Sequence, residues 1–279
     1  MLNFGLAGRV VVVTGGASGI GLASVIALAA DGARVAVLDA NEAGVQKAVE
    51  QARAVSASPD GVTGAVIDVR DKAVLDVAAA RVEEQLGPVN ALIASAGVAG
   101  AGKAEDLTLD EWDHVFAVNV GGAFATCQAF ARAMLARRAG SIVLLGSVDA
   151  LGGQPGRTHY TASKHAIAGM VKNLAIEWGS RGVRVNGVAP NLVDTPMVQR
   201  GVPPRFIRDV VEDRTPLGRM ARPEEIASAS LMLLSDAASY VNGVMLALDG
   251  GLLAGPFTRR QGNDLGSRKL LEAGVYSED

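Results

Sequence analysis

Short apolar runs and longer amphipathic runs alternate along most of the chain. The short runs are apolar throughout and rich in β-branched residues, which is typical of strands covered on both faces of a parallel sheet. They lie at residues 9–14, 34–39, 62–68, 91–95, 141–147, 183–188 and 244–249. Helical periodicity predicts helices at residues 20–30, 42–55, 73–86, about 109–138, about 160–178 and 223–234. Repeated strand–helix units predict an α/β fold, a single-domain doubly wound parallel (Rossmann-like) sheet with helices on both faces.

No linker divides this pattern, so we expect one domain over residues 1–251. Residues 191–222 hold several prolines and mixed charge, and we interpret them as a lid. Residues 252–279 form a C-terminal tail with four basic side chains, Arg259, Arg260, Arg268 and Lys269. Our hypothesis is that this tail folds over an active site and contacts an anionic group of a substrate.

Composition excludes several classes of function. The 279 residues carry a net charge of −3, with no basic block in the core region, so nucleic acid is not an expected partner. No apolar run approaches the roughly 18 residues that span a bilayer, and the first predicted strand begins too early for a signal peptide. The single cysteine, Cys127, cannot form an intrachain disulfide or a multi-thiolate metal site. These features indicate a cytoplasmic protein without a membrane partner or a bound metal.

A glycine-rich turn follows the first predicted strand and opens the first predicted helix. Its candidate cofactor-binding residues are Gly15, Ser18, Gly19, Ile20 and Gly21. Glycines at this place let the backbone turn tightly and let a pyrophosphate approach the start of the helix, where free N–H groups favour an anion. In this strand–turn–helix context the pattern predicts a dinucleotide site.

An acidic residue ends each of the next two predicted strands. Asp39 lies about 20 residues beyond the glycines, where a carboxylate accepts hydrogen bonds from ribose hydroxyls. It would also repel a 2′-phosphate, and neither Ala17 nor Ala40 supplies a cation, so the pattern favours NAD over NADP. Asp68 and Val69 are placed to meet the adenine. The alternatives are that Asp39 caps a turn and that Asp68 caps the next helix.

Tyr160 and Lys164 are four residues apart, on one face of a predicted helix. A phenol has a pKa near 10, and a nearby ammonium lowers it toward the range of an acid–base catalyst. Ser147 ends a predicted strand thirteen residues earlier, and Asn119 lies within the long predicted helix. The four residues together form a candidate catalytic set.

With these residues the chain resembles the short-chain dehydrogenase/reductase family, in its branch of about 250 residues with a Tyr-x3-Lys motif. The resemblance runs from about Leu6 to Gly251. It implies that Tyr160 is the acid–base and that Lys164 holds the nicotinamide ribose and lowers the tyrosine pKa. It also implies that Ser147 bonds the substrate oxygen and that Asn119 holds a water.

The resemblance also implies further contacts to the cofactor, with two departures. Pro190, with the backbone of Val193 and the hydroxyl of Thr195, would bind the carboxamide. Ala96 and Gly97 would support the ribose, but the family's usual Asn-Asn-Ala-Gly is Ala-Ser-Ala-Gly here. This first departure weakens local hydrogen bonding more than it threatens the chemistry. In the second, the usual glycine after the proline is an asparagine at position 191, which tolerates left-handed backbone angles, so the turn can survive.

The implied activity is the interconversion of a secondary alcohol and a ketone with NAD(H). Candidate substrate contacts are Asp149, Gln154, His159 and Asn191, and the favoured substrate is a polar cyclic alcohol or a sugar-like polyol. Asp149 and Gln154 share with Arg157 a stretch that borders the substrate pocket in the family, and its polarity indicates a substrate with hydroxyl or carboxylate groups. The alternative is that this stretch is an ordinary solvated loop. Alternatives on the same scaffold are a non-catalytic dinucleotide sensor and a cofactor-independent halohydrin lyase. The family implies a homotetramer or dimer, and an apolar stripe on the long helices is compatible with it: Phe116, Phe124, Phe130 and Met134.

Overall fold

The protein forms one parallel sheet of seven strands in the order β3-β2-β1-β4-β5-β6-β7, seen in a computed structural model that describes residues 4–255. The strands are β1 (Val10–Thr14), β2 (Arg34–Asp39), β3 (Val62–Val66), β4 (Val89–Ala94), β5 (Gly140–Leu145), β6 (Val183–Pro190) and β7 (Met245–Leu248). Each predicted strand is present, with ends that differ by a few residues. The expected doubly wound α/β fold is confirmed.

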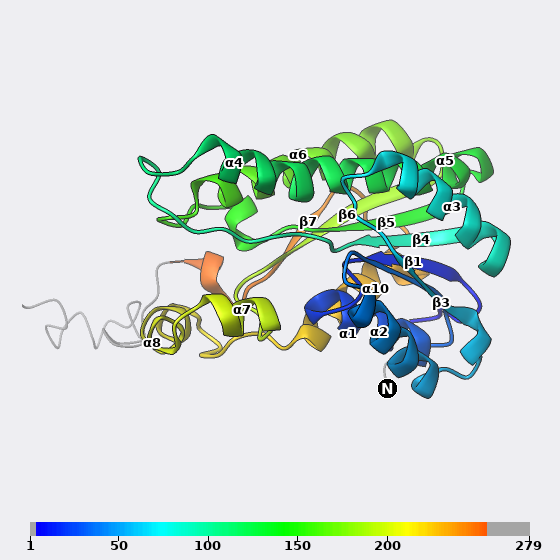
Figure 1. Ribbon diagram of the computed structural model, residues 1–279, viewed down its shortest axis with the longest axis horizontal. Coiled ribbons are helices and arrows are strands. Elements are labelled where there is room, and N and C mark those ends of the chain that lie inside the picture. The colour runs from blue at the N-terminus through cyan, green and yellow to red at the C-terminus, as the bar shows by residue number, and fades with distance from the viewer. Residues whose placement is uncertain (1–3, 256–279) are drawn as a thin grey trace, which may run out of the picture.

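Helices cover both faces of the sheet (Figure 1). One face carries α1 (Gly19–Ala30), α2 (Glu42–Val55) and α10 (Pro223–Leu234). The other carries α3 (Lys72–Leu86), α4 (Leu109–Phe116), α5 (Ala123–Arg137) and α6 (Thr158–Gly179). No helix of the described residues is long and apolar enough to cross a membrane.

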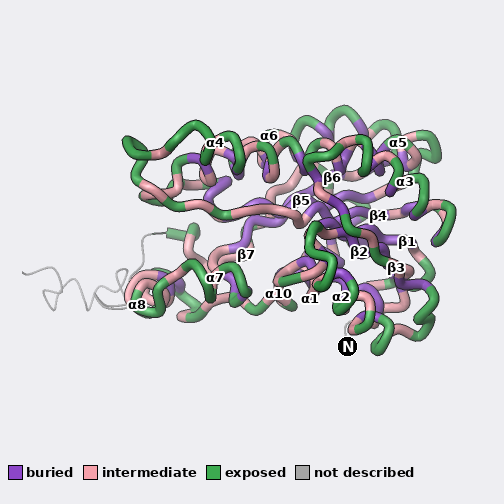
Figure 2. The backbone as a smooth tube through the Cα atoms, viewed as in Figure 1, coloured by how far each residue is buried: buried purple, intermediate pink, exposed green. Residues whose placement is uncertain are grey.

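The strands are apolar at every position because each face of the sheet packs against its own helix layer. In β1, Val10 and Val12 join the core cluster under α3, α5 and α6, whereas Val11 and Val13 join the cluster under α1 and α10. Cys127 of α5 is wholly buried in the first cluster. Figure 2 shows the result, a buried sheet between helices whose outer surfaces are exposed.

The long helix predicted at about 109–138 is confirmed as one helical run, but it is not α-helical throughout. A wide π-helical turn, Ala117–Gly122, separates α4 from α5. Within it the Asn119 amide bonds the backbone of Val98 in both directions, at 2.8 and 3.0 Å. A Cβ on Gly122 would lie 2.5 Å from Cγ2 of Val69, so this turn packs directly on the chain that follows β3. The wide turn therefore brings Asn119 to the carboxyl end of the sheet.

The predicted lid, residues 191–222, contains short helical pieces rather than irregular loop. They are α7 (Pro196–Gly201), α8 (Pro204–Phe206), a π-helical turn at Ile207–Val211 and α9 (Glu212–Arg214). They lie with the beginning of the tail at one end of the molecule (Figure 1). Of the predicted tail, Leu252–Ala254 forms a 3₁₀ turn, and its four basic residues lie outside the described residues.

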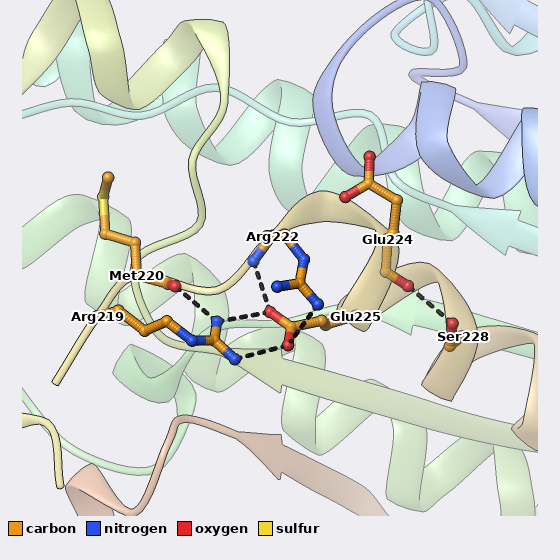
Figure 3. Close-up of polar contacts among 6 residues, drawn as sticks. All are labelled: Arg219, Met220, Arg222, Glu224, Glu225 and Ser228. Atoms are coloured by element: carbon orange, nitrogen blue, oxygen red, sulfur yellow. Dashed lines mark hydrogen bonds and ion pairs between the residues drawn. The ribbon is translucent and has the colours of Figure 1, made fainter. Parts of the chain in front are cut away.

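An ion-pair cluster fixes the end of this segment to the start of α10 (Figure 3). The Glu225 carboxylate accepts hydrogen bonds from the guanidinium of Arg219 at 2.8 Å and from the backbone N–H of Arg222 at 2.8 Å. The guanidinium of Arg222 adds a bond of 3.2 Å. The hydrogen bonds from Arg219 and Arg222 lower the pKa of Glu225 from 4.5 to about 2.

Glu225→Gln should lower the free energy of unfolding at pH 7 by up to about 1 kcal/mol, because the pair is partly solvated. A depressed folded pKa stabilises the protein above the ordinary value of 4.5, and that contribution disappears as the pH falls toward 2. Urea unfolding of wild type and variant should therefore converge at low pH. Glu224→Gln, which changes an exposed neighbour, is the matched control. A stability gap that stays constant down to pH 2 would contradict this account.

Candidate active site

The glycine turn lies where the strand order reverses, between β1 and β4, which is the usual ligand crevice of such sheets. A Cβ on Gly15 would lie 2.7 Å from the backbone nitrogen of Ala96, so the turn after β1 touches the chain after β4. A Cβ on Gly21 would lie 2.0 Å from the carbonyl oxygen of Gly15. Gly19 has a φ of +53°, a conformation that favours glycine. Each of these three glycines is thus required by local geometry.

A cavity of about 500 Å³, here the glycine-side cavity, opens above this turn. Most of the predicted cofactor residues line it: Gly15, Ser18, Gly19, Ile20, Asp39, Asp68, Val69, Ala96, Gly97 and Thr195. Gly21 is not among the lining residues, and its role is to let α1 pack on the turn. The structure therefore brings residues from five separate parts of the chain to one crevice, as the sequence pattern predicts.

The first turn of α1 and Asp39 face this cavity with groups suited to a dinucleotide. The Ser18 side chain makes no capping hydrogen bond, so it leaves the N-terminal N–H groups of α1 available to an anion. The Asp39 carboxylate accepts from the backbone N–H of Ala17 at 3.1 Å and of Asn41 at 3.0 Å. It thereby joins the end of β2 to the glycine turn, and it retains acceptor capacity for hydroxyl groups.

Asp68 is held by Arg70 instead of capping the next helix. The Arg70 guanidinium donates to both carboxylate oxygens, through Nε at 3.0 Å to each and through Nη2 at 2.5 Å to one. These bonds lower the pKa of Asp68. The cap of α3 is Asp71, which accepts from the N–H of Ala73 and Val74. The helix-cap alternative for Asp68 is therefore wrong, while its place on the cavity wall agrees with the cofactor prediction.

Tyr160 and Ser147 lie together on a second cavity of about 370 Å³, here the tyrosine-side cavity. Tyr160 projects from the first turn of α6, and Ser147 is the residue before a 3₁₀ turn, Val148–Ala150, that follows β5. A hydrogen bond between their side chains contributes to the Tyr160 titration. Ile20, Thr195 and Met197 line both cavities, which are therefore adjacent. The phenol stands beside the crevice of the glycine turn.

The pKa of Tyr160 differs from the sequence-based expectation. Burial raises it above the ordinary value of 10, while the charge of Arg157 and hydrogen bonds from Ser147 and Arg157 oppose that rise. Lys164 is not among the causes, although its Nζ lies 5.5 Å from the centre of the tyrosine ring. The direction of the pKa shift thus differs from the expectation, because burial is its largest cause.

Lys164 and Asn119 lie behind the cavity walls, both almost wholly buried. The Lys164 ammonium donates to the carbonyl of Leu145 at 2.9 Å, and burial lowers its pKa from 10.5 to about 8. Besides its bonds to Val98, the Asn119 amide donates to Ser163 Oγ at 3.1 Å. A Cβ on Gly97 would lie 3.2 Å from Asn119 Oδ1 and 3.8 Å from Lys164 Nζ. The small residue thus keeps both groups close to the glycine-side cavity.

Comparison with known proteins agrees with this geometry. A family model described as enoyl-(acyl carrier protein) reductase matches residues 15–253. D-threitol dehydrogenase of Mycolicibacterium smegmatis is 41% identical, over 89% of this chain and 94% of that protein. Galactitol 2-dehydrogenase (L-tagatose-forming) of Cereibacter sphaeroides is 42% identical, over 89% and 96%.

The chain belongs to the short-chain dehydrogenase/reductase family. A solved structure of 3-ketoacyl-(acyl-carrier-protein) reductase from Brucella melitensis, complexed with NADH, superposes with a TM-score of 0.81 at 27% identity and covers 88% of this chain and 99% of that one. The resemblance inferred from the motifs is confirmed. As a family member, the protein is an oxidoreductase acting on CH–OH groups, and the interconversion of a secondary alcohol and a ketone agrees with its relatives.

In this short-chain dehydrogenase/reductase, three of the four candidate substrate residues line the tyrosine-side cavity: Asp149, Gln154 and Asn191. Burial raises the pKa of Asp149. The Asn191 amide donates to Thr215 Oγ1 at 3.0 Å, which ties the end of β6 to the segment 191–222. His159 is not among the lining residues of any described cavity. It packs on Gly100, where a Cβ would lie 2.1 Å from its Nε2.

Several lining residues of this dehydrogenase/reductase carry no recognisable sequence signal. Arg70, His114 and Arg200 border the glycine-side cavity, and Arg157 borders the tyrosine-side cavity. Arg157 belongs to the polar stretch between Ser147 and Tyr160 that the family resemblance places beside the substrate pocket, but its position over the Tyr160 ring has no such sequence signal. Within residues 4–255, no group of three or more His, Cys, Asp or Glu side chains is placed to hold a metal ion.

Proposed function

We propose that the protein interconverts a secondary alcohol and a ketone with NAD(H), and that its substrate is a polar cyclic alcohol or a sugar-like polyol. The observation that carries this is the placement of Tyr160 and Ser147 on a cavity that shares part of its wall with the glycine-side cavity. A substrate oxygen can thus meet an acid–base pair beside the crevice where a dinucleotide fits. The names of the threitol and galactitol dehydrogenases support the polyol class.

The residues present fit a nicotinamide dinucleotide. The glycines of the turn have no side chains, so a pyrophosphate can approach the start of α1. The adenosine half of the dinucleotide would contact Asp39, Asp68 and Val69. The nicotinamide half would be held by the following residues: Ala96, Gly97, Tyr160, Lys164, Pro190, Val193 and Thr195. When bound, the nicotinamide supplies the two-electron acceptor or donor that hydride transfer requires. The NADH complex of a structural relative supports this assignment.

Side chains of the protein would transfer the proton to and from the substrate oxygen. In oxidation, the Tyr160 phenolate takes the proton of the substrate hydroxyl as hydride leaves the same carbon, and in reduction the phenol returns a proton to the oxygen. Ser147 would bond that oxygen and steady its developing charge. Lys164 would hold ribose hydroxyls and, together with a water at Asn119, carry the proton toward solvent. These roles complete the catalytic set of Asn119, Ser147, Tyr160 and Lys164.

The test is a fluorescence titration with NADH, followed by assays of NAD⁺ against a panel of secondary alcohols that includes polyols. We expect saturable NADH binding and turnover with at least one polyhydroxylated alcohol. Absence of NADH binding would instead favour halohydrin elimination on this scaffold. Binding without turnover of any alcohol or ketone would favour a dinucleotide sensor.

Asp39→Ala should lower kcat/KM for NAD⁺ by about tenfold to 100-fold, since hydrogen bonds to a charged acceptor contribute about 1.5–3 kcal/mol. The same change should raise the NADP⁺/NAD⁺ ratio of kcat/KM, because the repulsion of a 2′-phosphate is removed. Steady-state kinetics with both cofactors measure the two effects. Glu42→Gln removes an equal charge from an exposed site at the start of α2 and should change neither. An unaltered cofactor ratio in Asp39→Ala would refute the NAD assignment.

The expected assembly and location also remain proposals, a homotetramer or dimer in the cytoplasm. Two members of the predicted apolar stripe, Phe130 and Met134, belong to the core of the single chain. Phe116 stacks on Trp112 with ring centres 4.8 Å apart. Phe124 of α5 is 45% exposed, and Ile176 of α6 is 79% exposed. These two exposed side chains on the expected interface helices support self-association, which sedimentation velocity measures directly.

A further inference from the structure

The cation nearest to the Tyr160 ring is Arg157, not the lysine of the family motif. The Cζ atom of Arg157 lies 4.3 Å from the ring centre, compared with 5.5 Å for Nζ of Lys164. Arg157 is the residue before the first turn of α6, three positions before Tyr160, so both side chains leave the helix on the same side. Both line the tyrosine-side cavity.

Lys164 and Arg157 also differ in how their charge depends on pH and in their hydrogen-bond partners. Lys164 donates to the Leu145 carbonyl and has a pKa lowered to about 8 by burial, so an increasing fraction is neutral above that pH. A guanidinium keeps its charge over the whole working range. Arg157 forms no ion pair within residues 4–255, and its Nε is buried there without a hydrogen-bond partner. The Asp149 carboxylate interacts with Arg157 through its charge without a direct ion pair.

The charges that face the phenol come from three places. Arg157 precedes α6, Lys164 lies one helical turn beyond Tyr160, and Asp149 lies in the turn after β5. Asp149 raises the pKa of Tyr160, and Arg157 lowers it by its charge and by a hydrogen bond. The cavity wall contributed by residues 99–101 and by α7 adds no charged side chain. Arg157 and Asp149 therefore act on the phenol with opposite signs.

We propose that Arg157 is a positioning residue that acts through Tyr160, because its guanidinium stabilises the deprotonated form of that phenol. This proposal adds a residue to the proposed alcohol–ketone chemistry and rests on Tyr160 being its base. Burial penalises a phenolate at this position, and a guanidinium whose Cζ lies 4.3 Å from the ring centre opposes that penalty. The phenol thus has a permanent positive partner beside a lysine that loses its charge as the pH rises.

The first experiment titrates the phenol without any substrate. The chain has three tyrosines, and the tyrosinate absorbance of Tyr160→Phe subtracted from that of wild type isolates Tyr160. We expect Arg157→Gln to move this titration to higher pH and Arg157→Lys to restore it in part, measured against the corresponding double variants with Tyr160→Phe. Asp149→Asn should move it to lower pH. Arg132→Gln, at an exposed site on α5, removes an equal charge and should leave it unchanged.

The second experiment uses the pH profile of kcat/KM for alcohol oxidation, which rises with pH as the phenolate forms. An opposite charge this close commonly changes the ionised fraction on the acidic side by about tenfold, so Arg157→Gln should lose about tenfold in rate there. The loss should vanish at high pH. An effect on KM alone, or no recovery with Arg157→Lys, would show a structural or substrate-binding role and overturn the proposal.

The two experiments separate this proposal from the proposed function. If no alcohol is oxidised but the Tyr160 titration responds to Arg157 and Asp149 with opposite signs, the stabilisation stands and the activity assignment fails. If alcohols are oxidised but neither the titration nor the profile moves in a folded Arg157→Gln protein, the stabilisation fails alone. Circular dichroism and thermal melting establish folding, and Arg157→Lys and Asp149→Asn keep the test decisive if Arg157→Gln unfolds.

Discussion

Tyr160→Phe should lower kcat for alcohol oxidation by about 10²- to 10⁴-fold, the usual contribution of a positioned acid–base group. The ring remains and only the hydroxyl is lost, so the cavity wall and the α6 helix should be preserved. Binding of NADH should change little, because one neutral hydrogen bond contributes only about 1 kcal/mol. Stopped-flow oxidation of a substrate found in the alcohol panel, with NADH titration in parallel, measures both quantities.

The chain offers a matched control for this substitution. Tyr240 has a fully exposed side chain and is not among the residues that line the glycine-side or the tyrosine-side cavity, and Tyr240→Phe removes the same hydroxyl group. It should retain the wild-type rate. If Tyr160→Phe keeps a rate within a few-fold of wild type, another group supplies the proton and the catalytic set is wrong.

Gly21→Ala should weaken NADH binding by about tenfold to 100-fold, equivalent to about 1–3 kcal/mol of strain in the turn. The added Cβ would lie 2.0 Å from the carbonyl oxygen of Gly15, a backbone atom that can move only if the glycine turn moves. The displaced turn would no longer present the same surface to a pyrophosphate. Isothermal titration with NADH measures the loss, and thermal melting measures the cost to the fold.

Gly169→Ala is the control for a glycine-to-alanine change within a helix. Gly169 lies in α6, and a Cβ there would meet nothing within 4 Å. This variant should bind NADH normally and gain about 0.5–1 kcal/mol of stability, because alanine favours helix more than glycine. Equal NADH affinity in Gly21→Ala and Gly169→Ala would contradict a pyrophosphate site at the glycine turn.

The regular elements were predictable because local pattern and global packing agree. A strand such as β2 is apolar on both faces, and the sheet in fact packs against helices on both sides. The π-helical turn at Asn119 was not predictable in the same way. It is accompanied by the Asn119–Val98 hydrogen bonds and by the tight packing of Gly122 on Val69, which join segments far apart in the sequence. The periodicity of apolar residues cannot predict such long-range contacts.

In the candidate site, too, the features set by a local motif were predictable, and those set by tertiary contacts were not. Gly15 and Asp39 were predictable because a strand–turn–helix motif fixes where they lie relative to each other. The effect of Arg157 on Tyr160 was not predictable, since it depends on the direction of one side chain at the start of α6. The Tyr160 pKa was misjudged because burial outweighs a charge identified from spacing alone. The sequence thus identifies candidate reacting groups, and the structure is needed for their electrostatics.

The wholly buried cysteine makes this protein convenient for spectroscopic labelling. Burial raises the pKa of the Cys127 thiol to about 12, and it is the thiolate that reacts with maleimides. Because the chain has no other cysteine, the native protein already serves as an unreactive background. Gln199→Cys on the exposed surface of α7 would then introduce the one reactive thiol, and a fluorophore attached there would report movement of residues 191–222 as ligands bind.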